Sequence, residues 1–319
     1  MIELPILITI AFAIILIFAI IAVNKEAFTQ TSPSVLDTKP ILWFVIDDQP
    51  NTRKWSDFST RLSRQNNRGY SELFYKVAKH TQGKEFQVVL LNGRDEVVRT
   101  LKNYGAVIPE NVNLLPTSLW RTYVRIALLA NAGGLFVDGD SVLFLGPAIK
   151  PFIQSSNALF GISPTEPITS SVPDKNGPSP SPYLGYAQSS KQPVWTQAES
   201  ELLSFMKSGP SSYTSLIANR TDQKLMQKMI DSGVDVIREA ENNRKSDGTY
   251  LNIFDLFARA PSSVDNHHPN ISNKSAFISF DSDLLERSAQ LSFILKLSPQ
   301  QIEESDLLFA RLIKKGLNY

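Results

Sequence analysis

The hydrophobic positions divide the chain into two unlike parts. Residues 4–23 are almost entirely Ile, Leu, Ala, Phe and Val and carry no charge. As a helix, this run is long enough to cross the roughly 30 Å hydrocarbon core of a bilayer. A polar segment rich in Thr, Ser and Pro follows it. We therefore expect a short tail at 1–3, a single transmembrane anchor at 4–23, a polar stem at 24–39 and a folded domain at 40–319.

A cleaved signal peptide is the alternative for the first segment. Signal peptides usually have a shorter apolar region with a basic residue before it, and Met1-Ile2-Glu3 contains none. We favour a membrane anchor, in a Golgi, endoplasmic reticulum or other internal membrane. The charges that flank the run, Glu3 on one side and Lys25 and Glu26 on the other, do not indicate its orientation.

Beyond residue 40 the periodicity alternates between strand and helix. A continuous apolar run at 41–46 is typical of a buried parallel strand, and a helical pattern, a second strand and another helix follow it. This alternation predicts an α/β domain, with a mostly parallel, Rossmann-like sheet flanked by helices. The expected strands are 41–46, 86–91 and 158–162, the expected helices are 70–81, 95–104, 119–131, 192–206, 222–239 and 299–315, and 163–193 is expected to be a long loop.

The most distinctive motif is an acidic pair at the end of an apolar strand. Gly133-Gly134 begins this strand, and Asp138-Gly139-Asp140 ends it. Alternation in an extended strand would send both carboxylates the same way, and Gly139 would let another group approach the backbone. Hard cations such as Mg2+ and Mn2+ prefer carboxylate oxygens and commonly complete their shell with substrate phosphates. The pair is therefore a candidate metal site.

The helix before this strand carries Arg121 and Arg125, one turn apart. Most helical arginines lie on a solvated face. The alternative places Arg125 near the acidic pair, where its guanidinium could orient a carboxylate or a sugar-phosphate oxygen.

The stretch from Arg125 through Gly133-Gly134 to Asp138 and Asp140 resembles the sugar-binding D-x-D region of glycosyltransferase family 32 and of capsular-polysaccharide-type transferases. This resemblance implies a GT-A fold, a nucleotide-sugar donor, Mn2+ or Mg2+, and transfer with retention to a glycan, lipid or protein acceptor. It also implies that Asp138 and Asp140 contact metal and donor, and that Arg125 contacts the donor sugar or diphosphate. The family usually has an Asp three residues before the Arg, where this chain has Thr122. Further candidates for donor binding in this region are Arg121, Thr122, Gly133, Gly134 and Gly139.

Other polar groups are weaker candidates. Asp47 and Asp48 follow the first strand, where ligands of open α/β sheets bind, and they could contact the base or ribose of the nucleotide. One of His267 and His268 could be an additional metal ligand. A second D-x-D, Asp281-Ser282-Asp283, is assigned to a helix-capping loop because no glycine turn or arginine helix precedes it.

Composition narrows the function classes. With 319 residues, 42% of them hydrophobic, and a net charge of +1, the chain can form a full core and shows no nucleic-acid footprint. It has no cysteine, which excludes thiolate metal sites and cysteine nucleophiles. The prediction is a metal-dependent glycosyltransferase. Two alternatives remain: a haloacid-dehalogenase-like phosphatase with Asp138 as nucleophile and Asp140 as acid/base, and a transferase-like binding protein without catalysis.

Overall fold

The structure is a computed structural model that describes residues 39–47, 68–161, 181–207, 221–237, 251, 253–257, 259 and 276–318. Apart from residue 39, these residues belong to one unit, Pro40–Tyr319. The predicted anchor at 4–23 lies outside the described residues, as do the tail and nearly all of the stem. Within the described ranges, no helix combines the length and apolar character that a membrane crossing needs.

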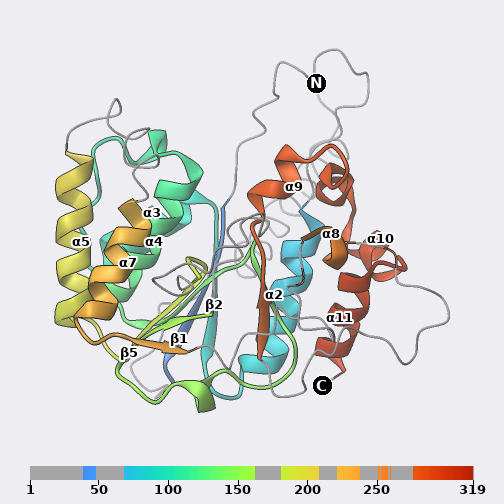
Figure 1. Cartoon of the computed structure of the whole chain (residues 1–319), viewed down its shortest axis with the longest axis horizontal. Helices are drawn as coiled ribbons and strands as arrows, with labels where there is room; N and C mark the ends of the chain where they lie inside the picture. Colours follow the sequence, from blue (N-terminus) through green and yellow to red (C-terminus); the bar gives the residue numbers. More distant parts are fainter. Residues whose placement is uncertain are drawn as a thin grey trace, which may run out of the picture. The chain divides into compact units, whose positions relative to one another are not determined.

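A six-stranded sheet in the order β2-β1-β3-β6-β5-β7 forms the centre of this unit (Figure 1). Strand β1 pairs in parallel with β2 and β3, and β5 pairs in parallel with β7. Strand β6 is antiparallel to both of its neighbours. The predicted α/β class with a mostly parallel sheet is confirmed. The strands are β1 (Ile41–Ile46), β2 (Gln87–Asn92), β3 (Gly134–Asp138), β5 (Asn157–Phe160), β6 (Leu184–Ala187) and β7 (Asp235–Ile237).

The sheet separates two hydrophobic cores because side chains alternate along its strands. Leu42 and Phe44 of β1 belong to one core, whereas Trp43 and Val45 belong to the other. Figure 1 shows helices on both sides of the strands. Helices α3 (Arg94–Asn103), α4 (Thr117–Asn131), α5 (Pro193–Met206) and α7 (Thr221–Asp231) cover the Trp43 side; α2 (Gly69–Gln82), α8 (Ile253–Leu256), α9 (Asp283–Arg287), α10 (Pro299–Glu303) and α11 (Leu308–Leu317) lie on the Phe44 side.

A second sheet of two antiparallel strands, β4 (Val142–Phe144) and β8 (Phe277–Ser279), packs into the Phe44 core. Strand β4 follows directly after the acidic pair, and β8 directly precedes the second D-x-D. Their pairing therefore brings two sequence-distant acidic segments to one place. Single 3-10 turns complete the fold: η2 (Val112–Leu114), η3 (Lys150–Phe152) and η4 (Ser292–Lys296).

Several predicted elements need correction. The predicted helix at 222–239 ends at Asp231, after which Gly233 adopts a positive φ and strand β7 begins. The predicted helix at 299–315 is two helices, α10 and α11, with a break between them at residues 304–307. The expected loop at 163–193 contains β6, a strand too short to give a periodic pattern of its own. The strand at 41–46 has the predicted bounds.

Candidate active site

The carboxyl ends of three parallel strands meet at one edge of the sheet. Asp47 follows β1, Arg94 begins the helix after β2, and Asp138 ends β3. The register places Asp138 beside Val45, two residues before Asp47. Open α/β sheets bind their ligands at this edge, so the topology itself gathers charged groups where a ligand site is expected.

Asp138 and Asp140 are both buried, with relative exposures of 4% and 1%. Asp138 is the last residue of β3. Asp140 was predicted to continue this strand, but it lies outside it. Residues 138–141 form a turn in which the Ser141 N–H donates to the Asp138 carbonyl at 3.1 Å. The two carboxylates face one guanidinium because of this turn, and not because of strand alternation.

The Asp140 carboxylate is held by three donors. Its Oδ1 accepts a hydrogen bond from Ser71 Oγ at 2.6 Å, and its Oδ2 accepts from the Asp47 N–H at 3.2 Å and from Arg68 Nη1 at 3.0 Å. Arg68 also donates to the Asp47 carbonyl. Arg68 and Ser71 flank the start of α2, so this helix fixes the second carboxylate of the pair.

The Asp138 carboxylate has fewer donors and a perturbed pKa. Its Oδ1 accepts from the Asp140 N–H at 3.1 Å, and its Oδ2 from Ser141 Oγ at 3.3 Å. Burial raises the pKa of Asp138 to about 6; Arg121 opposes this shift and the Asp140 charge adds to it. A buried carboxyl group beside another carboxylate is a common arrangement at functional sites.

Arg121 of α4, and not Arg125, contacts the acidic pair. Its Nε lies 3.4 Å from Asp138 Oδ2, and its Nη2 lies 3.9 Å from Asp140 Oδ2. Burial lowers the pKa of Arg121, but Asp138, Asp283 and Asp140 outweigh it, so the pKa is raised and the side chain stays charged. Because α4 runs back along β3, Arg121 lies a turn closer to the carboxyl edge of the strand than Arg125 does.

The other two predicted positions on α4 are a buried arginine and a threonine that bonds within the helix. Arg125 is 1% exposed, and a Cβ added at Gly185 of β6 would come within 3.6 Å of its Cδ. No ion pair joins Arg125 to the acidic pair within the described part of the chain. Thr122 donates its hydroxyl to the Ser118 carbonyl one turn earlier at 3.0 Å, a bond within the helix.

The second D-x-D reaches the same guanidinium. Asp283 Oδ1 lies 3.0 Å from Arg121 Nη1, the shortest ion pair that Arg121 makes among the described residues. Asp281 accepts a hydrogen bond from the Asp283 N–H at 3.1 Å, but the N-cap residue of α9 is Ser282, and its side chain makes no capping bond. The prediction of a segment before a helix is correct, but the N-cap residue does not cap this helix with its side chain, and the prediction misses Asp283, whose carboxylate belongs to the site.

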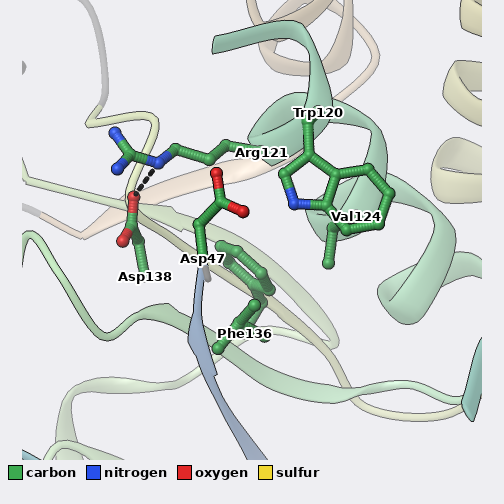
Figure 2. Close-up of a pocket in the computed structure, with 7 residues that line it drawn as sticks. Asp47, Trp120, Arg121, Val124, Phe136 and Asp138 are labelled. Carbon is green, nitrogen blue, oxygen red and sulfur yellow. Dashed lines mark ion pairs between the residues drawn. The ribbon is translucent and has the colours of Figure 1, made fainter. Parts of the chain in front are cut away.

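A small pocket lies between α4 and the ends of β1 and β3 (Figure 2). The cavity has a volume of about 10 Å³, which is enough for about one water molecule. Asp47 Oδ1 pairs with Arg94 Nε at 3.4 Å, and Arg94 lies 5.0 Å from the centre of the Trp120 ring. The residues that line the pocket are Val45, Asp47, Trp120, Arg121, Val124, Phe136 and Asp138.

Asp47 Oδ2 is buried and makes no hydrogen bond within the described ranges. Figure 2 shows the Asp47 carboxylate facing the space between Arg121 and Trp120. Burial, the largest effect, raises the pKa of Asp47; the charges of Arg94 and Arg121 oppose it. An acceptor left without a donor in a lined pocket is a place where a ligand can bind.

The three glycines have structural roles at the two ends of β3. Gly133 and Gly134, with φ of 72° and 93°, lie at the amino end of β3, away from the acidic pair. A Cβ on Gly134 would come 2.4 Å from the Ile41 carbonyl oxygen. The group that approaches Gly139 is the Phe44 ring, 2.3 Å from where a Cβ would lie. These glycines allow close packing of the chain.

Three predicted candidates, Asp48, His267 and His268, lie outside the described residues. Sequence reasoning missed Arg68, Ser71, Arg94 and Asp283. Arg94 and Asp283 could have been found from the sequence, because each lies a few residues after a short apolar run. Arg68 and Ser71 carried none, since they reach Asp140 only through the packing of α2.

The donor chemistry of the acidic pair fits the divalent cation that the resemblance implies. Mg2+ is commonly held by one or two carboxylates, with water and substrate phosphates as its other ligands. Within the described ranges, no group of three or more Asp, Glu or His side chains is arranged to hold a metal ion. A cation bound at this pair would have Asp138 and Asp140 as its protein ligands, with Arg121 beside them both.

Comparisons of the chain with protein-family models, with curated proteins and with solved structures give no match.

Proposed function

We propose that this chain is a membrane-anchored, metal-dependent glycosyltransferase with a GT-A-like fold. It moves a sugar, with retention, from a nucleotide-sugar donor to a glycan, lipid or protein acceptor. The observation that carries the proposal is the buried pair Asp138 and Asp140, next to Arg121 at the carboxyl edge of a mostly parallel sheet. The resemblance of residues 125–140 to D-x-D transferases supports the same class. Residues 4–23 are the proposed anchor.

The charges of the site give each residue a role in this reaction. Asp138 and Asp140 would hold the cation, which, when bound, neutralises the nucleoside diphosphate as it leaves. Ionised Asp47, Asp138, Asp140 and Asp283 carry four negative charges against three positive ones on Arg68, Arg94 and Arg121, which leaves a net charge of −1. An anionic diphosphate needs a further positive charge to bind here, and a divalent cation supplies it.

Asp47 is the candidate for recognising the nucleotide. Its free Oδ2 could accept a hydrogen bond from a ribose hydroxyl or a base N–H. The pocket that it faces has room for about one water molecule, so a donor can enter only when side chains that line the pocket move.

The test is turnover of nucleotide sugars. The full-length chain in detergent is incubated with a panel of nucleotide sugars, with and without Mn2+, and release of nucleoside diphosphate is measured. We expect slow, Mn2+-dependent release from at least one donor, and loss of that release in Asp138→Asn. Asp231→Asn, an exposed acid on α7, is the matched control and should behave as the unchanged chain does. Trapping of a phosphorylated Asp138 would instead support the phosphatase alternative and end this proposal.

A further inference from the structure

Arg121 lies where the two D-x-D motifs meet. Its guanidinium makes ion pairs with Asp138 and Asp140 of the first motif and with Asp283 of the second, at 3.4, 3.9 and 3.0 Å. The side chain is 14% exposed. Arg121 therefore pairs with both carboxylates that the proposed function assigns to a metal ion, and Arg68 pairs with Asp140 as well, at 3.0 Å.

Strand pairing fixes this arrangement. Val142 of β4 pairs with Ser279 of β8, and the Phe280 N–H donates to the Ser141 carbonyl at 2.9 Å. Beyond these strands, the hydroxyls of Ser141 and Ser282 are 3.0 Å apart. The segments that carry the two motifs are thus bonded side by side, and this pairing holds the backbone of Asp283 beside Arg121.

A second observation points to a ligand at the same place. Asp47 is 3% exposed, its Oδ2 accepts no hydrogen bond from the described residues, and it lines one pocket with Arg121 and Asp138. The site therefore holds an acceptor that the described residues leave unsatisfied, next to the guanidinium (Figure 2). A donor group or a hydrated cation would satisfy it.

We propose that Arg121 and a divalent cation compete for Asp138 and Asp140, and that Asp283 is the positioning residue that retains Arg121 when the cation binds. This inference rests on the proposed function for the identity of the cation. A guanidinium and a divalent ion repel each other at the same carboxylates, so binding of the ion requires Arg121 to withdraw. Its contacts with the acidic pair are its two longer ones, and its contact with Asp283 is the shortest.

The exchange gives the site two charge states. Without the cation, Arg121 pairs with Asp138 and Asp140 and lines the pocket. With the cation, the guanidinium stays on Asp283 and the pocket loses one of its lining groups, which is the movement that entry of a donor requires. Arg121 is thereby a gate that opens when the cation binds.

The experiment measures Mn2+ affinity by calorimetry on the full-length chain in detergent, freed of metal with a chelator, without nucleotide. Arg121→Met removes the competitor and keeps the length of the side chain, so we expect Mn2+ to bind at least about tenfold more tightly. Asp283→Asn removes the retaining group, so Arg121 stays on the acidic pair and Mn2+ should bind roughly three- to tenfold more weakly. Asp231→Asn should leave the affinity unchanged.

A double-mutant cycle separates positioning from direct ligation. In the Arg121→Met background, Asp283→Asn should change Mn2+ affinity by less than about twofold, because the ion pair between Asp283 and Arg121 is already absent there. A full loss in that background would make Asp283 a metal ligand and overturn its positioning role. Equal or weaker Mn2+ binding by Arg121→Met would overturn the competition itself, and Arg121→Gln repeats the measurement if the Met variant does not fold.

The outcomes also separate this inference from the proposed function. Tighter Mn2+ binding by Arg121→Met, without turnover of any nucleotide sugar by the unchanged chain, would support the exchange and contradict the transferase. Mn2+-dependent turnover with no change of Mn2+ affinity in Arg121→Met would support the transferase and contradict the exchange.

Discussion

Replacing Asp138 by Asn should raise the stability of the folded chain at neutral pH and remove its activity. The side chain keeps its shape and loses its charge. Its carboxyl has an ordinary pKa of 3.8, which burial raises to about 6 in the folded chain. At neutral pH the Asp138 side chain is ionised in both states, but its ionisation costs more free energy in the folded chain than in the unfolded chain, and Asn removes this cost.

The size and the pH dependence of this stability difference follow from proton linkage. A shift of about two pKa units corresponds to about 3 kcal/mol. Between pH 4 and 6, the folded chain binds a proton that the unfolded chain has released, so the unchanged protein loses stability as the pH rises through this window. Above pH 6 the cost is constant. The advantage of the Asn variant should be up to about 3 kcal/mol at pH 7.5 and should nearly vanish at pH 4.

Urea unfolding in the presence of a chelator, at pH 7.5 and pH 4.5, measures this difference. Activity is measured as release of nucleoside diphosphate, and we expect a loss of at least about 100-fold, or 3 kcal/mol of transition-state stabilisation. Asp231→Asn is the charge-matched control. A less stable Asn variant at pH 7.5 would show that the ion pair with Arg121 outweighs the cost of burial, and the reasoning on Asp138 would be wrong.

Four further predictions concern Asp140, the glycines near β3, the domain boundary and ligand binding. Asp140→Asn should lose activity but also lower stability, by about 1–3 kcal/mol, because three donors lose a charged acceptor; urea unfolding at pH 7.5 should give the opposite sign to Asp138→Asn. Gly139→Ala forces a Cβ against the buried Phe44 ring and should lower the free energy of unfolding by about 1–3 kcal/mol. Gly134→Ala should destabilise the fold at least as much, because the new Cβ meets the Ile41 carbonyl and Gly134 has a positive φ. Unfolding midpoints measure both effects, and a neutral effect at either position would contradict the packing. A fragment of residues 40–319 should be soluble and unfold cooperatively by circular dichroism, and aggregation while the full-length chain is stable in detergent would count against a separate anchor and stem. Nucleoside diphosphate and Mn2+ should each tighten the binding of the other by the same factor, so calorimetry that finds nucleotide affinity independent of Mn2+ would contradict a shared site.

The local pattern of apolar and polar residues was sufficient to predict many of the helices and strands. The apolar run at 41–46 gives the bounds of β1, and helical spacing gives α2, α3 and α5 to within one residue at each end. These elements bury one continuous face or stripe, which is what periodicity detects. The short strands β4, β6 and β7 have three or four residues each and are held by partners far away in sequence, so their own residues give little signal.

The acidic pair was predictable, but its partners were not. Asp138 and Asp140 stand next to a glycine turn and a strand, a local pattern. The choice between Arg121 and Arg125 depended on how α4 lies along β3, and spacing on a helix cannot decide it. Arg125 was expected at the acidic pair, whereas the structure places Arg121 there and buries Arg125 near β6. Orientation between elements is a tertiary property.

The second acidic motif shows the same limit most clearly. Ser141 and Ser282 are 141 residues apart in the sequence and lie 3.0 Å apart in the structure. The local sequence of Asp281-Ser282-Asp283 predicts the start of a helix, and the hydrogen bond from the Asp283 N–H to Asp281 agrees with this prediction. Only the pairing of β4 with β8 turns Asp283 toward Arg121 and makes the start of α9 part of a charged site. A buried guanidinium is stable only where it is paired, and of the three carboxylates that pair with Arg121, Asp283 makes the shortest ion pair although it lies farthest away in the sequence.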